Sequence, residues 1–348
     1  MSERVLTTGE LNRALLARQL LLERARPSFA DAIAQVGALQ TQYAPSAYVG
    51  LWTRVHGVTR DAVTEALEDG SLVQGTLLRV TIHLVGREAY WRHAVAIRAS
   101  RRQWFLRVEE REAAARPALE ARMHAGADAL RMALADGPRT VRELGPLVTG
   151  FLGNAGLWVD LVRVPPSGTW DRRRADRLAL AEQWVGPENV TEEEGLTDVV
   201  ASYLRAFGPA PWKDVASWAG IPVADAKRGG ANLDLATYRD EAGRPLVDLR
   251  DAPLPDATTP APVRFLPNWD ALTLAHARRT GVLDEETRAR VYNIHTPFAP
   301  AAVLVEGRVA GEWKFDQGSI AVIPYAPFAA DVRDAVEEER VALEAFHA

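Results

Sequence analysis

Residues 72–85 read LVQGTLLRVTIHLV, a stretch that predicts two short β-strands joined by a turn. Helical segments precede it over residues 8–24, 29–38, 46–55 and 59–68, with Ser28 and Thr59 as expected N-caps. Gly70 ends the last of these helices. Helices followed by a small hairpin are typical of a winged helix, in which a helix-turn-helix core carries a two-stranded wing.

The same order of elements recurs twice along the chain. In the second set, helices are predicted over residues 87–108, 117–134, 140–148 and 153–162, with a hairpin over residues 162–184. In the third set, helices are predicted over residues 196–207, 212–219 and 223–233, with a hairpin over residues 235–249. A linker over residues 249–262 leads to a small antiparallel sheet within 303–324 and a helix over residues 331–346. We therefore predict an α+β fold of three tandem winged-helix domains, 1–108, 109–190 and 191–250, followed by 251–348 with the linker, the small β element and the terminal helix.

Composition and charge narrow the class of protein. A chain of 348 residues with 47% apolar and 25% charged residues is long enough for two or three domains with their own cores. The net charge of −5, from 41 basic and 46 acidic residues, argues against a nonspecific coat on nucleic acid. This net charge is still compatible with a locally basic groove, since arginines are concentrated in residues 92–116 and 163–177.

Several classes of site are not expected. The chain has no cysteine, so it has no disulfide, thiolate zinc site or thiol nucleophile. The histidines are scattered without metal-ligand spacing, and no phosphate-binding loop or serine-hydrolase elbow occurs, so we expect no metal and no cofactor. Without a signal segment or an apolar run of membrane-spanning length, the expected location is cytoplasmic.

A pair of glutamines is the first candidate site. Residues 39–45 read LQTQYAP, and Pro45 biases Ala44 away from helical geometry. If the chain leaves the preceding helix in an extended form, the side chains of Gln40 and Gln42 point to the same side. The alternative is that both are solvated or cap-forming glutamines, and the motif alone is a weak signal.

Two further groups of polar residues are candidates. Strand alternation would place Arg79, Thr81 and His83 on one face, either as a half-exposed wing or as a wall beside the glutamines. The second group comprises Trp269, Asp270, His276 and Arg279. This group either organises a domain interface or contributes to the site.

Several of these segments together resemble the AlkZ-like family of bacterial DNA glycosylases. The carrying segments are LQTQ at 39–42, LWTR at 51–54, LLRVTIHL at 77–84, FLPNWD at 265–270 with His276 and Arg279, and GRVAGEW at 307–313. The resemblance implies three winged helices in a C shape around DNA, with Gln40 and Gln42 matching the family's catalytic Gln-aliphatic-Gln motif. Two positions depart from the pattern: Thr41 stands where an aliphatic residue is usual, and Arg278 where an acid is common.

The implied activity is that of a monofunctional DNA glycosylase. An N7-alkylated purine is already cationic and leaves without a general acid, so two neutral amides could suffice to stabilise the sugar cation and hold the attacking water. Bulky or crosslinked adducts of DNA-alkylating natural products follow from the resemblance as a further substrate class, in DNA repair or self-resistance. We expect a monomer that acts on the nucleoid, with DNA contacts from Arg54, Arg172, Arg173, Arg174 and Lys213.

Two other functions fit the predicted fold. A noncatalytic winged-helix regulator would show sequence-specific sites and dimer symmetry, although no heptad or dimer arm is evident. A protein-interaction scaffold would explain the domains but not the Gln-x-Gln motif.

Overall fold

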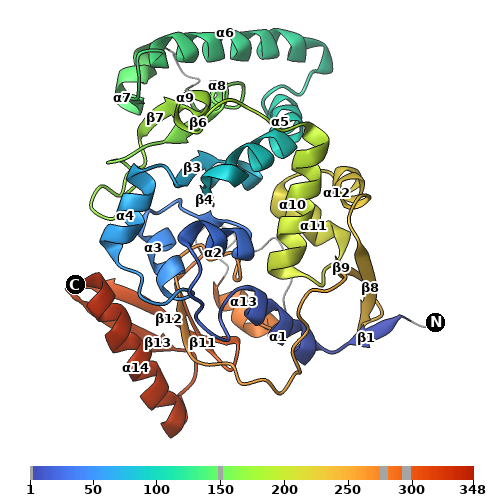
Figure 1. Ribbon diagram of the computed structural model, residues 1–348, viewed down its shortest axis with the longest axis vertical. Helices are drawn as coiled ribbons and strands as arrows, with labels where there is room; N and C mark the ends of the chain where they lie inside the picture. The colour runs from blue at the N-terminus through green and yellow to red at the C-terminus, as the bar shows by residue number, and fades with distance from the viewer. Residues whose placement is uncertain (1–2, 148–151, 275–280, 292–298) are drawn as a thin grey trace.

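The computed structural model describes residues 3–147, 152–274, 281–291 and 299–348 (Figure 1). Its helices are α1 Thr8–Arg18, α2 Phe29–Val36, α3 Pro45–Trp52, α4 Arg60–Glu68, α5 Arg87–Glu109, α6 Arg116–Leu134, α7 Val141–Leu144, α8 Leu152–Ala155, α9 Ala181–Trp184, α10 Glu192–Phe207, α11 Trp212–Ala219, α12 Val223–Gly230, α13 Glu285–Val291 and α14 Ala330–His347. Within the described ranges, no helix has the length and apolar character needed to cross a membrane.

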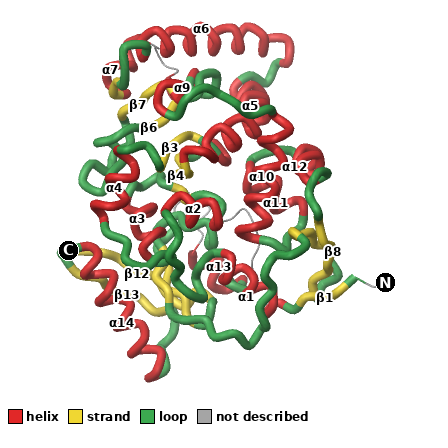
Figure 2. The backbone as a smooth tube through the Cα atoms, in the orientation of Figure 1, coloured by secondary structure: helices red, strands yellow, loops and turns green. Residues whose placement is uncertain are grey.

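In the part of the chain that the structure describes, the strands form three separate sheets (Figure 2). They are β1 Arg4–Leu6, β2 Leu39–Gln40, β3 Leu72–Thr76, β4 Ile82–Gly86, β5 Arg139–Thr140, β6 Leu161–Arg163, β7 Arg177–Leu180, β8 Leu235–Asp240, β9 Pro245–Leu249, β10 Arg264–Leu266, β11 Ala302–Val305, β12 Arg308–Asp316 and β13 Ser319–Pro324. The mixed content of helices and sheets confirms an α+β protein.

Local capping explains where many helices begin. Ser28 and Thr59 cap α2 and α4 through their hydroxyl groups, as predicted. Thr7, Thr140 and Thr191 each form a capping box with the glutamate three residues later, at the start of α1, α7 and α10. These short-range signals are readable from the sequence because donor and acceptor lie within one turn.

The largest sheet has the strand order β2-β4-β3-β6-β7-β5. The first predicted hairpin is β3 and β4, the second is β6 and β7, and an antiparallel β3–β6 pairing joins them, with Gln74 opposite Arg163. This sheet continues across the boundary predicted between residues 108 and 109. The four domain ranges and the winged-helix arrangement stay predictions.

Helix α10 packs against both α5 and α12 beside this sheet (Figure 1). Two glycines allow the close approach. A Cβ added to Gly195 would lie 2.7 Å from the carbonyl oxygen of Arg92, and one added to Gly229 would lie 2.6 Å from that of Leu196. Helix α10 is therefore held directly against the backbone of the first predicted domain.

The remaining sheets lie toward the two chain ends. The predicted C-terminal strands are found as β11, β12 and β13, with β10 added at the edge and α14 packed against the sheet. The third predicted hairpin is β8 and β9, and β1 joins it in parallel, with Arg4 opposite Tyr238. The β1 pairing and β10 were not predicted.

Three predictions of secondary structure are wrong. The first helix ends at Arg18 and not at residue 24, since Leu20 adopts a left-handed conformation with φ 55°. The predicted helix 153–162 is only the short α8, because Leu161 pairs with Leu180 in the sheet. The third error concerns Arg79 and is described with the site.

Candidate active site

The chain leaves α2 in an extended form, which is the condition under which the sequence places Gln40 and Gln42 on the same side. Gly37 ends α2 with φ 89°, and β2 follows, with Gln40 opposite His83 of β4. The backbone N–H of Thr41 continues the ladder by donating to the carbonyl of Ile82 at 2.8 Å. Thr41 is buried, whereas Gln40 is half-buried and Gln42 exposed, so the side chains alternate and both amides lie on the outer side.

Both glutamine side chains accept long hydrogen bonds, one from the turn before β4 and one from the first residue of β4. Nη2 of Arg79 donates to Oε1 of Gln40 at 3.4 Å, and the backbone N–H of Ile82 donates to Oε1 of Gln42 at 3.4 Å. Bonds of this length are weak. They orient the two carbonyl groups while leaving acceptor capacity for other donors.

Arg79 does not lie on a strand, which corrects the predicted alternation of Arg79, Thr81 and His83. Residues Leu78–Val80 form a 3-10 turn in which Arg79 and Val80 have φ values of 54° and 60°. Few non-glycine residues adopt this left-handed region, and for a β-branched valine it is strained. Nη1 of Arg79 donates to the carbonyl of Trp218 at the end of α11.

His83 faces the interior and Thr81 holds the turn. The Oγ1 hydroxyl of Thr81 donates to the carbonyl of Leu78 at 3.1 Å. Nδ1 of His83 lies 3.0 Å from the carbonyl oxygen of Thr81, which assigns the proton to Nδ1. Burial, with a smaller contribution from the charge of Arg79, lowers the pKa of His83 to about 3. His83 is therefore a neutral imidazole beside the pair.

The loop between β6 and β7 brings arginines next to the motif. Nη1 of Arg173 donates to the hydroxyl of Tyr43 at 2.7 Å, and Tyr43 directly follows Gln42. Arg172 and Arg174 are exposed on the same loop, and Nε of Arg174 lies 3.3 Å from a carboxylate oxygen of Asp176. Tyr43 was missed by the sequence analysis, although its position beside Gln42 was available as a signal.

Arg54 is not a DNA contact, which corrects a second expectation. Its side chain is 1% exposed and forms an ion pair with Asp270, also 1% exposed, at 2.9 Å. Since a phosphate cannot reach a guanidinium enclosed in this way, the pair instead ties the segment after α3 to the C-terminal region. Of the two roles left open for Asp270, the geometry fits the interface role.

The other expected residues are dispersed. Lys213 is exposed on α11, the helix that ends at the Trp218–Arg79 contact. Trp269 is half-buried with φ 56°, and its backbone N–H donates to the carbonyl of Ala299. His276 and Arg279 lie outside the described residues, as does Arg278.

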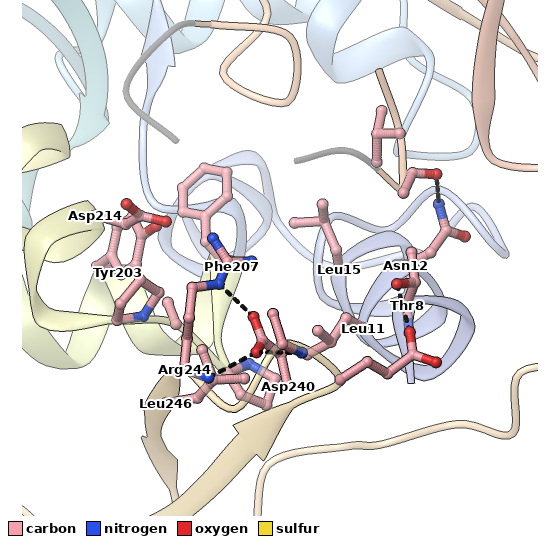
Figure 3. Close-up of a pocket in the computed structure, with 17 residues that line it drawn as sticks. Thr8, Leu11, Asn12, Leu15, Tyr203, Phe207, Asp214, Asp240, Arg244 and Leu246 are labelled. Carbon is pink, nitrogen blue, oxygen red and sulfur yellow. Dashed lines mark hydrogen bonds and ion pairs between the residues drawn. The ribbon is translucent and has the colours of Figure 1, made fainter. Parts of the chain in front are cut away.

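A cavity of about 250 Å³ between α1, α10 and the β8–β9 turn is drawn in Figure 3. Its polar groups bind one another: Arg244 donates to Asp240, Thr8 donates to Glu241, and Asn12 donates to the carbonyl of Gly281 at 2.9 Å (Figure 3). These hydrogen bonds occupy the polar groups that line the cavity, and no predicted site residue is among them. We therefore interpret the cavity as a structural junction between the N-terminal helix and the third hairpin.

Comparisons with known proteins agree with this architecture. The family model described as DNA glycosylase AlkZ-like matches residues 33–346, nearly the whole chain. No curated protein matches the sequence. Among solved structures, the Streptomyces sahachiroi DNA glycosylase AlkZ is similar in fold, with a TM-score of 0.77 at 18% sequence identity, covering 98% of this chain and 96% of that chain. The family match covers both the Gln-x-Gln segment and the C-terminal sheet, and the chain therefore belongs to the AlkZ-like DNA glycosylase family and is a DNA glycosylase.

Proposed function

We propose that this DNA glycosylase hydrolyses the N-glycosidic bond of cationic alkylated purines in double-stranded DNA, N7-alkylguanine above all. Gln40 and Gln42 are the proposed catalytic pair. The observation that carries the proposal is the chemistry of their hydrogen-bond partners, which are a guanidinium and a backbone N–H. Neither group gives up a proton at neutral pH. The pair is therefore suited to a leaving group that needs no protonation.

The imidazole of His83, which lies opposite Gln40 in the sheet, supports the same choice of substrate. A histidine beside a glycosidic bond is an obvious general acid for an uncharged base. His83 is unsuited to this role, because its lowered pKa keeps it neutral and its Nδ1–H is directed at the carbonyl of Thr81. An alkylated purine carries its positive charge already, so it departs as a neutral base.

The two amides take different roles in this proposal. The exposed carbonyl of Gln42 has an acceptor site left for a water molecule, which it orients toward the anomeric carbon. The carbonyl of Gln40, half-buried and held by Arg79, directs its dipole at the sugar as positive charge develops there. As the water attacks, its proton passes to solvent or to the departing base.

The DNA would lie along the surface that carries these amides. The exposed arginines Arg172 and Arg174 and the exposed Lys213 supply positive charge for phosphates, while Arg173 holds Tyr43. The proposal includes three winged-helix units and a monomeric enzyme. Bulky or crosslinked adducts are a second proposed substrate class, in repair or self-resistance.

The direct test is base release from defined duplexes. A duplex with a single 7-methylguanine should lose that base, while an otherwise identical duplex with uracil should stay intact over the same period. The free base and the abasic strand are both measured, by chromatography and by strand cleavage at the abasic site. Uracil release at a comparable rate would contradict the proposal, and sequence-specific binding without release of either base would favour the regulator.

A further inference from the structure

A second cavity, of about 280 Å³, lies against the strained turn that carries Arg79. Its walls come from α5, from this turn and from the C-terminal end of α11. It shares Arg79 with the glutamine pair, because the same guanidinium donates to Gln40. The cavity therefore borders the candidate active site through Arg79, and none of its lining residues lines the structural junction of Figure 3.

Trp104 is the aromatic side chain that α5 contributes to the lining of this cavity. It is 53% exposed on α5, whereas the core packing of that helix is made by neighbours such as Phe105 and Leu106. A tryptophan exposed to this extent contributes little to the core. It presents a flat ring beside the apolar Val80 and Ile97, which also line the cavity.

Two arginines, Arg79 and Arg101, also line the cavity. Arg101 is buried and bound to Asp160 at 2.9 Å, so its position is fixed by an ion pair behind the wall. Arg79 is held by the carbonyl of Trp218. Aromatic and apolar surface combined with positive charge is typical of sites that hold a base and its phosphate.

Gly220 keeps this region open. It has φ 78°, and a Cβ at this position would lie 3.2 Å from the Cα and N atoms of Arg79. A side chain here would press on the turn and occupy space at the cavity. The glycine lets the end of α11 approach the turn while the cavity stays accessible.

We propose that this cavity receives a single nucleobase unstacked from the duplex, with the base stacked on Trp104. The proposal rests on the proposed function, since it places the base next to the sugar that Gln40 and Gln42 would act on. The ring of Trp104 accepts any base face, whatever its sequence. The base comes either from the lesion or from the nucleotide opposite it.

Photocrosslinking distinguishes these sources without requiring catalysis. 5-Iodouracil is placed in one duplex at the lesion position and in another opposite a 7-methylguanine. After irradiation with the full-length protein, mass spectrometry identifies the linked peptide. A crosslink to Trp104 from the first duplex assigns the cavity to the lesion base, and one from the second assigns it to the opposite base. A crosslink to Trp104 from neither duplex overturns the proposal.

Substitution of Trp104 gives an independent readout. Trp104→Ala should weaken binding to the lesion duplex about 10- to 100-fold, as expected for loss of one base–aromatic stack, while Trp104→Phe should retain most of the affinity. Two matched controls are Met132→Ala and Val341→Ala, at exposed apolar side chains of α6 and α14. An effect of Trp104→Ala no larger than in these controls contradicts the proposal.

Failure of this inference differs from failure of the proposed function. If wild-type protein releases no 7-methylguanine but crosslinks through Trp104, the substrate is wrong and the base site stands. If the base is released while neither crosslinking nor Trp104→Ala shows an effect, the base site is wrong and the catalytic proposal stands.

Discussion

Nη2 of Arg79 lies 3.4 Å from Oε1 of Gln40, and the other terminal nitrogen of the same guanidinium donates to the carbonyl of Trp218. The Trp218 carbonyl belongs to the last turn of α11, where the helix dipole favours a cation. One side chain therefore connects the third predicted domain to the candidate catalytic pair of the first. The orientation of Gln40 depends on how these two domains pack.

Replacing Arg79 by methionine should lower kcat about 10- to 100-fold with a smaller change in KM, because Gln40 loses its orienting donor. Arg79→Lys should recover part of the rate, since an ammonium can still reach one of the two carbonyls. Single-turnover and steady-state release of 7-methylguanine would measure both constants. An unchanged kcat in Arg79→Met would remove Arg79 from the positioning of Gln40.

Gln42→Ala should reduce release of 7-methylguanine by at least about 100-fold, as expected when a positioned dipole is removed from a charged transition state. The melting temperature should stay close to that of the wild type, because Gln42 is exposed. Gln183→Ala is a suitable control, since this glutamine is also exposed but donates to the carbonyl of Ala135, away from the motif. Equal rates for the two variants would exclude Gln42 from catalysis.

Arg54→Met should destabilise the protein by about 3–5 kcal/mol, because it leaves the carboxylate of Asp270 buried without its partner. Urea unfolding would measure the loss, and the double variant Arg54→Met with Asp270→Leu should recover much of it. DNA affinity of the folded fraction should not change. A variant of full stability with weakened DNA binding would restore the DNA-contact role for Arg54.

Stability should fall on acidification, in part through His83. Its folded pKa of about 3 lies below the unfolded value of about 6.5, so between these pH values the unfolded chain binds more protons. The stabilisation is complete above pH 6.5 and is lost as the pH falls, by about 2 kcal/mol at pH 5. Burial lowers the pKa of His93 and His347 as well, which acts in the same direction.

The measurement is the difference in unfolding free energy between pH 7 and pH 5. His83→Gln should show a smaller difference than the wild type, whatever its absolute stability. His56→Gln is the matched substitution, because it removes an exposed imidazole and not a buried one. An identical pH dependence in His83→Gln and wild type would contradict the assignment of a buried, neutral imidazole.

Arg172→Ala should weaken binding to duplexes of any sequence and reduce the salt dependence of log Kd by about one unit of slope, as expected for one lost phosphate contact. Arg172 is suited to this test because its guanidinium is exposed. Fluorescence anisotropy over a series of salt concentrations would give the slope. A loss of affinity limited to lesion-containing duplexes would indicate a contact to the lesion and not to the backbone.

Much of the local structure was predictable because its causes are local. Ser28 and Thr59 cap helices through bonds spanning three residues, and the β8–β9 hairpin closes over a short turn. The long-range pairings were not predictable. Strand β1 joins β8 from more than 200 residues away in the chain, with Arg4 opposite Tyr238, and no pattern in so short a strand identifies its partner.

The site residues divide in the same way, into those predictable from local patterns and those that depend on distant contacts. Gln40 and Gln42 were identified as a pair because side chains two residues apart share a side in an extended segment. The alternation applied to Arg79 failed because two consecutive left-handed residues form a turn there. Trp104 gave no signal, since a tryptophan in a helix with this composition is usually part of a core.

The amino-acid sequence alone indicated most of the helices, the three hairpins, Gln40 and Gln42 as a candidate pair, and the resemblance to a glycosylase family. These properties depend on residues that are near neighbours in the chain. Tertiary structure alone decided that Arg54 is buried against Asp270, that His83 is neutral, and that Arg79 links Gln40 to α11. Burial and ion pairing depend on which distant segments pack together. The residue type alone therefore does not determine the environment of a side chain.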